Sequence, residues 1–276
     1  MSEQAVEIRA LRTPDELQAA VELQKIYWGS DMSDIVPLHM LLSIANYGGH
    51  VFGAYVDGAL VGLLVGFLGA KISPHDKTPA RDALLVMSKR MVVLPEYRNH
   101  KIGEQLKQAQ RRFALDHGVP LVTWTFDALI SRNAYLNLHK LGAIGQGYQV
   151  NFFGASAANP TLSGDRLVVN WWVAHPHTAD RTLREYPDAA LVSAWKDGRP
   201  CFVGGEAGAP ALLLEIPSDI QALEKENPTL AAAWRTYARE AFPTLFAAGY
   251  IATDVIRRDD RTFYVFTPDD GTFTFK

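Results

Sequence analysis

The sequence predicts an α/β protein whose mixed central sheet is flanked by helices, followed by an α+β extension. Three observations predict this class. An apolar segment at Leu84–Leu94 precedes a basic loop and an amphipathic helix, Asp57-Gly58 separates two apolar runs, and strand and helix signals alternate through the first 155 residues. Because 276 residues exceed one domain of about 150 residues, we expect two domains, at residues 1–155 and 156–276.

The first expected elements are a strand, two helices and a hairpin. Thr13 and Glu16 form a capping box with Pro14 at the first helical position, so a helix begins here. Asp57-Gly58 is a strong turn signal between two antiparallel strands. In chain order we expect a strand at Val6–Ala10, a helix from Thr13 to about Tyr27, a helix from Pro37 to the Gly48-Gly49 pair, and strands at His50–Val56 and Leu60–Leu68.

A basic loop follows the next strand, which Pro95 ends because proline has no amide to donate to a ladder. The loop carries Arg98, His100 and Lys101, and Gly103 then opens a helix. A loop of this kind directs backbone amides and a helix N-terminus at one point. The segment is typical of an anion site, and a polyphosphate fits it best.

The helix after this loop is amphipathic. Leu106 and Phe113 lie on or near its apolar face, whereas Lys107 and Gln110 are expected mostly outside that face. The apolar run that follows, at Leu121–Phe126, is expected to form a strand. We expect this strand to be parallel to the one before the loop, because a helical crossover joins them.

The rest of the chain predicts further strands and one long helix. Asp165–Val173 is a strong strand signal, and Thr229–Ala248 has the periodicity of an amphipathic helix. Arg235 and Arg239 lie beside or opposite its apolar stripe, where we expect them to be solvated or ion-paired. Further strands are expected at Gln149–Phe153, Ala189–Trp195, Pro200–Gly204, Ala211–Ile216, Ile251–Ile256 and Thr262–Phe266.

Composition and charge exclude several classes of protein. The net charge of −3 argues against broad nucleic-acid binding, and the single Cys201 excludes an internal disulfide framework. His175-Pro176-His177 is interpreted as a loop, so we expect no metal site. The first ten residues are charged rather than secretory, and Leu60–Ala70 is too short to span a bilayer. We therefore expect a cytoplasmic protein with no membrane or nucleic-acid partner.

The segment MVVLPEYRNHKIG, at residues 91–103, resembles motif A of the GNAT acetyltransferases. The family pattern is Arg or Gln, two residues, Gly, one residue, then Gly or Ala. Arg98 and Gly103 match this pattern, whereas Lys101 stands where the family usually has Gly. We expect Lys101 to keep ordinary helical angles and to add a cation. The order of strands and helices over about residues 5–155 is also similar to the GNAT order.

The resemblance implies a GNAT-like fold and a coenzyme A thioester, either acetyl-CoA or succinyl-CoA, as co-substrate. In the family, the loop amides hold the pyrophosphate, and the exposed edge of the preceding strand binds the pantetheine arm. An amide near a bulge in that strand polarises the thioester carbonyl. The residues that the resemblance predicts to bind the thioester are Met91, Val92, Val93, Arg98, Asn99, His100, Lys101, Ile102 and Gly103.

Ser131–Ala143 resembles a second family motif, a helix in which a Tyr four residues before a Gly protonates the leaving thiolate. Leu138 occupies that position here, and Tyr135, about one turn earlier, is predicted as catalytic, with a packing aromatic as the alternative. Asp127 ends a parallel strand and is also predicted as catalytic, with a turn or cap role as the alternative. Other candidate bases by residue type are His75, Glu96 and His139.

Residues 216–250 resemble a long GNAT group, some members of which accompany N-acylamino acid racemases and for which N-succinyltransfer has been proposed. The resemblance implies transfer of an acetyl or succinyl group to a small primary amine, such as an amino acid. Lys89, Arg90 or a C-terminal Arg would pair with a succinyl carboxylate. The extension would cover the acceptor site or form a homodimer interface. The alternatives are a GNAT-fold protein that senses acyl-CoA without turnover, and a scaffold subunit that binds a partner.

Overall fold

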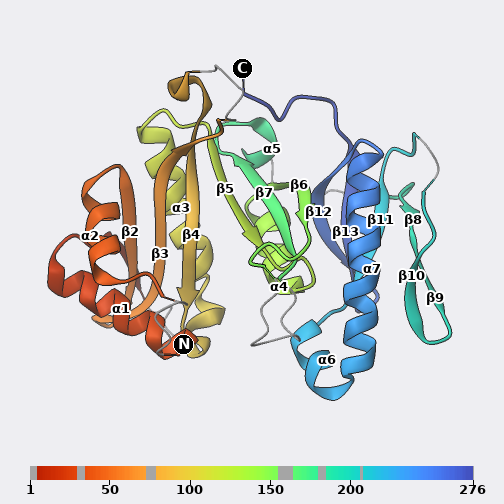
Figure 1. The fold of residues 1–276 in the computed structure, drawn as a ribbon, viewed down its shortest axis with the longest axis horizontal. Coiled ribbons are helices and arrows are strands. Elements are labelled where there is room, and N and C mark those ends of the chain that lie inside the picture. Colours follow the sequence, from red (N-terminus) through yellow and green to blue (C-terminus); the bar gives the residue numbers. More distant parts are fainter. Residues whose placement is uncertain are drawn as a thin grey trace. The chain divides into compact units, whose positions relative to one another are not determined.

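The computed structural model describes residues 5–29, 35–72, 79–154, 164–179, 185–205 and 208–275 (Figure 1). The chain forms two compact units, Met1–Thr123 and Trp124–Lys276. The division falls inside strand β5 (Leu121–Phe126). The domain boundary predicted at residues 155 and 156 lies outside the described residues, so it stays a prediction, as does the position of His75.

Unit 1 contains a mixed sheet in the order β1-β2-β3-β4-β5. β1 to β4 are joined in antiparallel pairs, and β4 and β5 are parallel, as predicted. The β2–β3 hairpin turns at Asp57 and Gly58, both with positive φ, which is the turn that this dipeptide predicts. The bounds are β1 Val6–Ala10, β2 Gly49–Val56, β3 Ala59–Ala70 and β4 Leu84–Val93.

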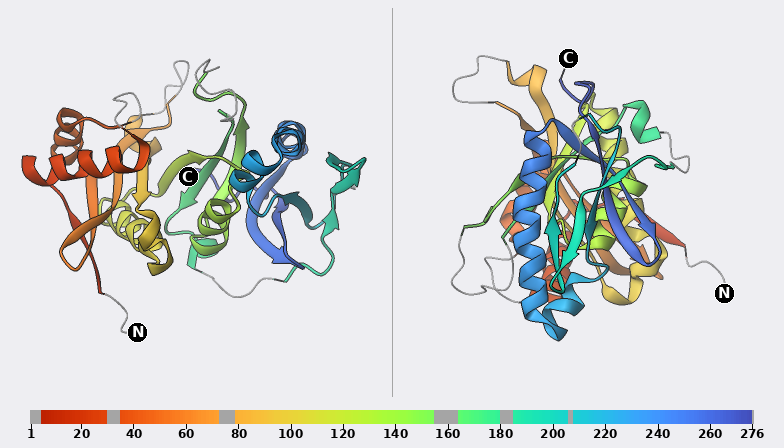
Figure 2. Two further views of the ribbon diagram at one scale, coloured as in Figure 1. Left: turned by 90° about the horizontal axis from the view of Figure 1, so that it is seen from below. Right: turned by 90° about the vertical axis from the view of Figure 1, so that its right-hand side faces the viewer.

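Helices cover both faces of the unit 1 sheet (Figure 2). α1 (Pro14–Trp28) and α2 (Leu38–Asn46) lie on one face, and α3 (Ile102–Asp116) lies on the other. The predicted capping box is confirmed, because Thr13 and Glu16 each accept a hydrogen bond from the other's backbone N–H. Short 3₁₀ segments, η1 (Ala80–Ala83) and η2 (Pro95–His100), precede β4 and α3.

One prediction for α3 is wrong. Lys107 and Gln110 are buried, with exposed fractions of 2% and 0%, although both were expected mostly outside the apolar face. They face the sheet beside Ser88 of β4 and His50 of β2, so the polar side chains satisfy one another there. Periodicity treats every polar residue as outward, and it misses a buried polar cluster of this kind.

Unit 2 contains a second run of strands, in the order β7-β6-β12-β13-β11-β8. The strand predicted at Gln149–Phe153 is wrong. The observed strand, β6, ends at Gln149, and the residues after it form a turn. The segment predicted as one strand at Ala189–Trp195 is two, because Val192 separates them. The bounds are β6 Ile144–Gln149, β7 Arg166–Trp172, β8 Ala190–Leu191, β11 Leu212–Ile216, β12 Tyr250–Arg258, β13 Arg261–Pro268 and the separate pair β9 Ser193–Lys196 and β10 Arg199–Phe202.

The helices of unit 2 include the predicted long helix, α7 (Pro228–Ala247). Its apolar stripe packs on β13, where Phe242 contacts the rings of Tyr264 and Phe266. α4 (Ser131–Ala134) continues into a π-helical segment, η3 (Tyr135–Lys140), which packs against β12. The remaining helices are α5 (Pro176–Ala179) and α6 (Ile220–Glu226). α5 corrects the interpretation of His175-Pro176-His177 as a loop, because Pro176 begins one helical turn.

None of the helices described is long and apolar enough to cross a membrane. Within the same described ranges, no group of three or more His, Cys, Asp or Glu side chains is arranged to hold a metal ion.

Candidate functional site

The segment from β4 to α3 has the geometry of an anion-binding turn. η2 follows β4, and Lys101 then takes a left-handed conformation, with φ 55° and ψ 19°, directly before α3 begins at Ile102. This corrects the expectation that Lys101 keeps ordinary helical angles. The first amides of α3, at Ile102 and Gly103, come before the point where intrahelical hydrogen bonds begin, so they point outward together at its positive end.

A Lys101→Gly variant is expected to raise the free energy of unfolding by about 0.5–1 kcal/mol. Glycine relieves the left-handed strain of an L-residue, and its greater freedom in the unfolded chain offsets part of that gain. Urea unfolding measures the difference. Lys225→Gly, at an exposed right-handed position of α6, is the matched control and should lose about 1 kcal/mol. Equal losses in the free energy of unfolding for both variants would contradict a strained backbone at Lys101.

Cationic groups surround this turn. Arg98 donates a hydrogen bond from Nη2 to the Tyr27 hydroxyl over 3.1 Å, and its guanidinium lies 5.7 Å from the centre of that ring. The His100 carbonyl accepts from Gln105 Nε2 over 3.3 Å, which ties the turn to α3. Arg98, His100 and Lys101 are exposed. Sequence reasoning missed Tyr27, because nothing local links the end of α1 to a loop 71 residues later.

β4 carries the bulge that the family resemblance implied. Val65 of β3 pairs with Arg90 and Gly66 pairs with Ser88, so Lys89 is the extra residue. The β4–β5 ladder ends at the pair Met87 and Thr123. Among the described residues of unit 1, β4 beyond that point pairs only with β3, which leaves the other edge of the predicted Met91–Val93 segment without a strand partner.

A buried polar cluster lies between this bulge and α3. Lys107 Nζ donates to Ser88 Oγ over 2.9 Å and to Gln110 Oε1 over 3.2 Å, and Gln110 Nε2 lies 2.8 Å from His50 Nε2. Burial lowers the pKa of Lys107 well below its usual value. Burial, with the nearby Lys107 charge, lowers the pKa of His50 to about 3. The added Cβ of any residue at Gly66 would meet His50 at 2.6 Å, so the cluster fills its space.

Asp127, predicted as catalytic, lies in unit 2 in an ion pair. Its Oδ1 accepts from Arg235 Nη1 over 2.6 Å and from the Leu129 backbone N–H over 3.0 Å. Arg235 also donates from Nη2 to Glu224 Oε1 over 2.8 Å, and the side chains of Asp127 and Arg235 are each 13% exposed. Arg239 similarly pairs with Asp165, so the prediction that these α7 arginines are solvated or ion-paired is confirmed. Asp127 thus stabilises a turn through the Leu129 amide and pairs with the Arg235 guanidinium. Its catalytic role stays a prediction.

An Asp127→Asn variant is expected to lower the free energy of unfolding by about 2 kcal/mol, because Arg235 loses a close carboxylate in a mostly buried pair. A catalytic base would in addition lose at least 100-fold in kcat. Glu224→Gln is the matched control, since it weakens the same cluster without touching Asp127. Unchanged stability in both variants would contradict the ion pair, and equal kcat in both would remove Asp127 from catalysis.

Tyr135, the other predicted catalytic residue, opens the π-helical segment of unit 2. Its ring is stacked 4.4 Å from that of His139, and the Arg257 guanidinium lies 5.3 Å from its centre. His139 Nδ1 lies 2.9 Å from Asp254 Oδ1. Leu138, at the family's tyrosine position, is buried with 1% exposed. Sequence reasoning named His139 by type alone and missed Asp254, which lies 115 residues later.

Residues 47–139 match the acetyltransferase (GNAT) domain. This GNAT segment includes β4, the anion-binding turn, α3 and the helix that carries Tyr135, whereas residues 140–276 lie outside it. No curated protein sequence matches the chain.

Solved structures give further likenesses. The chain is similar to the ribosomal-protein-S18-alanine N-acetyltransferase from Escherichia coli, with 14% identity and a TM-score of 0.47, over 66% of this chain and 100% of that one. It is also similar to a GNAT-family acetyltransferase from Streptococcus pneumoniae, with 14% identity and a TM-score of 0.47, over 60% of this chain and 98% of that one. A third similar structure is an IAA acetyltransferase from Bacillus cereus, with 12% identity and a TM-score of 0.43, over 60% of this chain and 98% of that one.

Proposed function

We propose that this chain is an acyl-CoA-dependent N-acyltransferase that transfers an acetyl or succinyl group to a small primary amine, such as an amino acid. The observation that carries the proposal is the segment from β4 to α3, within the GNAT match, where left-handed Lys101 precedes the first amides of a 15-residue helix. A pyrophosphate is the ligand that such a turn binds best.

The groups in this segment fit a coenzyme A thioester. The turn offers outward amides at Ile102 and Gly103 and the cations of Arg98 and Lys101, which suit the phosphates. The edge of β4 at Met91–Val93 offers backbone groups for an amide-containing arm. Val92 is buried, and the backbone of the nine predicted residues would supply most of the hydrogen-bond donors.

Acyl transfer from a thioester to an amine needs few catalytic side chains. When bound, the thioester supplies an activated carbonyl: the amine nitrogen forms a bond to it, the carbon–sulfur bond breaks, and the amine proton passes to a base while the sulfur takes a proton. Placing two reactants together contributes much of the acceleration. The chain would hold the thioester at the turn and polarise its carbonyl with a backbone amide beside the Lys89 bulge. Asp127 as base and Tyr135 as acid complete the proposal.

A Tyr135→Phe variant is expected to lower kcat at least tenfold with little change in the KM for the thioester. The substitution removes only the hydroxyl, so the ring contacts with His139 and Arg257 remain. Steady-state kinetics measure the separate effects on kcat and KM. Tyr55→Phe, in β2 of unit 1, is the matched control. An unchanged kcat would leave Tyr135 as a packing aromatic, and an unstable variant would show as a lowered Tm.

The choice between acetyl and succinyl donors depends on a cation for the second carboxylate. Lys89 is exposed at the bulge of β4, while the Arg90 guanidinium lies 4.6 Å from the centre of the Trp28 ring. A succinyl carboxylate near the bulge would pair with Lys89. The acetyl donor needs no such cation.

A second candidate function is a GNAT-fold protein that binds acyl-CoA and senses it without turnover. Buried Leu138, at the family's tyrosine position, favours this alternative. Both functions need the same thioester site, so they differ only in the fate of the acyl group.

Thermal unfolding with saturating CoA, acetyl-CoA and succinyl-CoA tests the shared site. At about 100 times Kd, binding adds about 2.7 kcal/mol, which raises the Tm by several degrees. A larger rise in Tm with one thioester would identify that thioester as the acyl donor. No shift with any of the three compounds would contradict both candidate functions.

A further inference from the structure

The proposed reaction does not use the polar cluster that lies buried in unit 1. All of its side chains have exposed fractions between 0% and 8%, and they are Lys107 and Gln110 of α3, Ser88 of β4 and His50 of β2. Removing an amine, an amide, a hydroxyl and an imidazole from water costs free energy that their mutual hydrogen bonds only partly return. Apolar side chains would fill the same space more cheaply, so packing alone does not account for the cluster.

Ser88 lies where β4 changes its neighbours. The parallel ladder with β5 ends one residue earlier, at the pair of Met87 and Thr123. The register with β3 then shifts after the pair of Ser88 and Gly66, which leaves Lys89 as the extra residue. Because the extra residue of a bulge is left out of the ladder, the direction of the backbone here depends on what fixes Ser88.

Lys107 contacts Ser88 from the face of the unit 1 sheet that α3 covers (Figure 2). Its Nζ donates to Ser88 Oγ over 2.9 Å, and no other side chain among the described residues hydrogen-bonds to that hydroxyl. Gln110 Oε1 accepts from the same Nζ over 3.2 Å, and Gln110 Nε2 lies 2.8 Å from His50 Nε2. The amine that fixes Ser88 is therefore itself fixed from behind.

Gly66, the β3 partner of Ser88, gives the cluster its space. A Cβ at this position would lie 2.6 Å from His50 Nε2 and 2.7 Å from Gln110 Nε2, closer than non-bonded atoms approach. The cluster thus occupies the place of a side chain directly opposite the bulge. Since protein interiors are close-packed, a displacement of the cluster would displace the strand pair that it contacts.

α3 joins the cluster to the anion-binding turn. Lys107 follows Gly103 by four residues, which is about one helical turn and about 6 Å along the axis. The outward amides at the start of the helix and the Lys107 side chain therefore keep a fixed separation. A phosphate bound at the turn and a carbonyl placed at the bulge would be positioned by the same helix.

We propose that Lys107 is a positioning residue for the acyl transfer. Through Ser88 it fixes the bulge of β4, so that the backbone amide beside Lys89 faces the thioester carbonyl of the bound acyl-CoA. A donor stabilises developing negative charge best when it is already oriented, and Lys107 supplies that orientation without touching the substrate. The inference rests on the proposed function and deepens it by naming the side chain that orients the amide.

The ¹³C signal of carbonyl-labelled acetyl-CoA bound to the full chain tests the proposal without an acceptor amine. In wild type we expect this signal to move downfield from that of free acetyl-CoA, because the bulge amide polarises the carbonyl. Lys107→Met should remove most of this displacement and keep the acetyl-CoA affinity within about threefold of wild type, since the turn is unchanged. Ser88→Ala should have the same effect, and the double variant should lose no more than either single variant because both act through one hydrogen bond.

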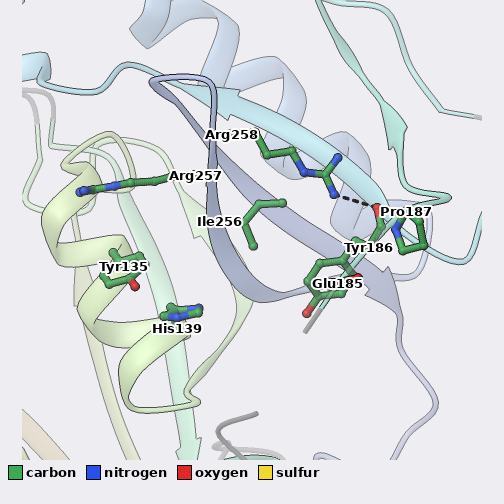
Figure 3. A pocket seen from close by; sticks show the side chains of 8 residues that line it. All are labelled: Tyr135, His139, Glu185, Tyr186, Pro187, Ile256, Arg257 and Arg258. Atoms are coloured by element: carbon green, nitrogen blue, oxygen red, sulfur yellow. Dashed lines mark hydrogen bonds between the residues drawn. The ribbon is translucent and has the colours of Figure 1, made fainter. Parts of the chain in front are cut away.

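Two controls separate this role from packing and from acid catalysis. Gln110→Met alters the same buried cluster but keeps the hydrogen bond between Lys107 and Ser88, so the displaced signal should remain. Tyr135 lines a cavity of about 540 Å³ in unit 2 (Figure 3), and its proposed proton goes to the sulfur, so Tyr135→Phe should also keep the displaced signal. Thermal unfolding of each variant separates loss of the contact from loss of the fold, and Ser88→Ala decides if Lys107→Met does not fold.

The two proposals fail in different ways. A folded wild-type chain that does not bind acetyl-CoA would overturn the proposed function and this inference with it. Binding with an undisplaced carbonyl signal, or with a displacement that Lys107→Met and Ser88→Ala both leave in place, would overturn only the role of Lys107. An equal loss of the displacement in Gln110→Met or Tyr135→Phe would overturn that role as well, because the signal would then not depend on the contact with Ser88.

Discussion

A Gly103→Leu variant is expected to lose at least 100-fold in affinity for acetyl-CoA, about 2.7 kcal/mol, while the fold is retained. Gly103 is the second residue of α3, where the outward amides would contact the pyrophosphate, and a leucine side chain there competes for the same space. The fold should not suffer, because leucine favours a helix over glycine by about 1 kcal/mol. Loss of binding with an equal or higher Tm is therefore the expected signature.

The matched control for this variant is Gln108→Leu. It lies in the same helix, about one and a half turns further from the N-terminus, and adds a leucine without blocking the amides. Titration calorimetry of both variants with acetyl-CoA should separate them by about two orders of magnitude in affinity. If Gly103→Leu binds acetyl-CoA as well as wild type does, the phosphates lie elsewhere.

The stability of unit 1 is expected to fall by about 3 kcal/mol between pH 7 and pH 4 through His50 alone. In the folded chain its pKa is lowered to about 3, whereas in the unfolded chain it stays near its ordinary 6.5. The unfolded state therefore binds a proton first as pH falls. His50 contributes full stability above about pH 6.5 and loses it progressively down to about pH 3. The physical cause is burial between Phe52 and Phe113, with Lys107 adding positive charge nearby.

A His50→Gln variant removes this titration and keeps a side chain that can hydrogen-bond to Gln110. Free energies of unfolding from urea at pH 4 and pH 7 should differ less in the variant than in wild type, by about 3 kcal/mol. His39→Gln, at an exposed site on α2, is the control and should leave the pH dependence unchanged. A variant with the same pH dependence as wild type would show that His50 is not the group responsible.

Much of unit 1 could be predicted from the sequence, because local signals specify it. The capping box at Thr13, the Asp57-Gly58 turn and Pro95 each act over a few residues, and the structure places a helix start, a hairpin and a strand end at these positions. The parallel pairing of β4 and β5 follows from the crossover that joins them. The long α7 helix was predictable from its apolar period for the same reason.

The parts that sequence reasoning missed depend on contacts between distant residues. Lys107 and Gln110 looked outward because their partners, Ser88 and His50, come from other strands. The left-handed Lys101 was missed because lysine ordinarily takes right-handed angles, even though the family pattern has glycine at this position. Local patterns carry propensity and period, and they do not carry these tertiary contacts.

The candidate site likewise contains residues that local patterns predict and residues that only tertiary contacts bring together. The loop residues were found as a contiguous pattern, because backbone amides at a helix start need no distant partner. The dyad of His139 and Asp254 joins two segments that no spacing rule connects. Asp127 was found by its place after a strand, while its ion pair with Arg235 was outside the reach of any local rule.

The most direct test of the central claim is product formation by the full chain with acetyl-CoA or succinyl-CoA and a panel of amino acids, followed by mass spectrometry. More than one N-acylated amino acid formed per chain shows turnover. The account predicts N-acylated amino acid and free CoA in equal amounts, both lost in Gly103→Leu. Binding of the thioesters with no acylated product across the panel would contradict the account and leave the acyl-CoA sensor.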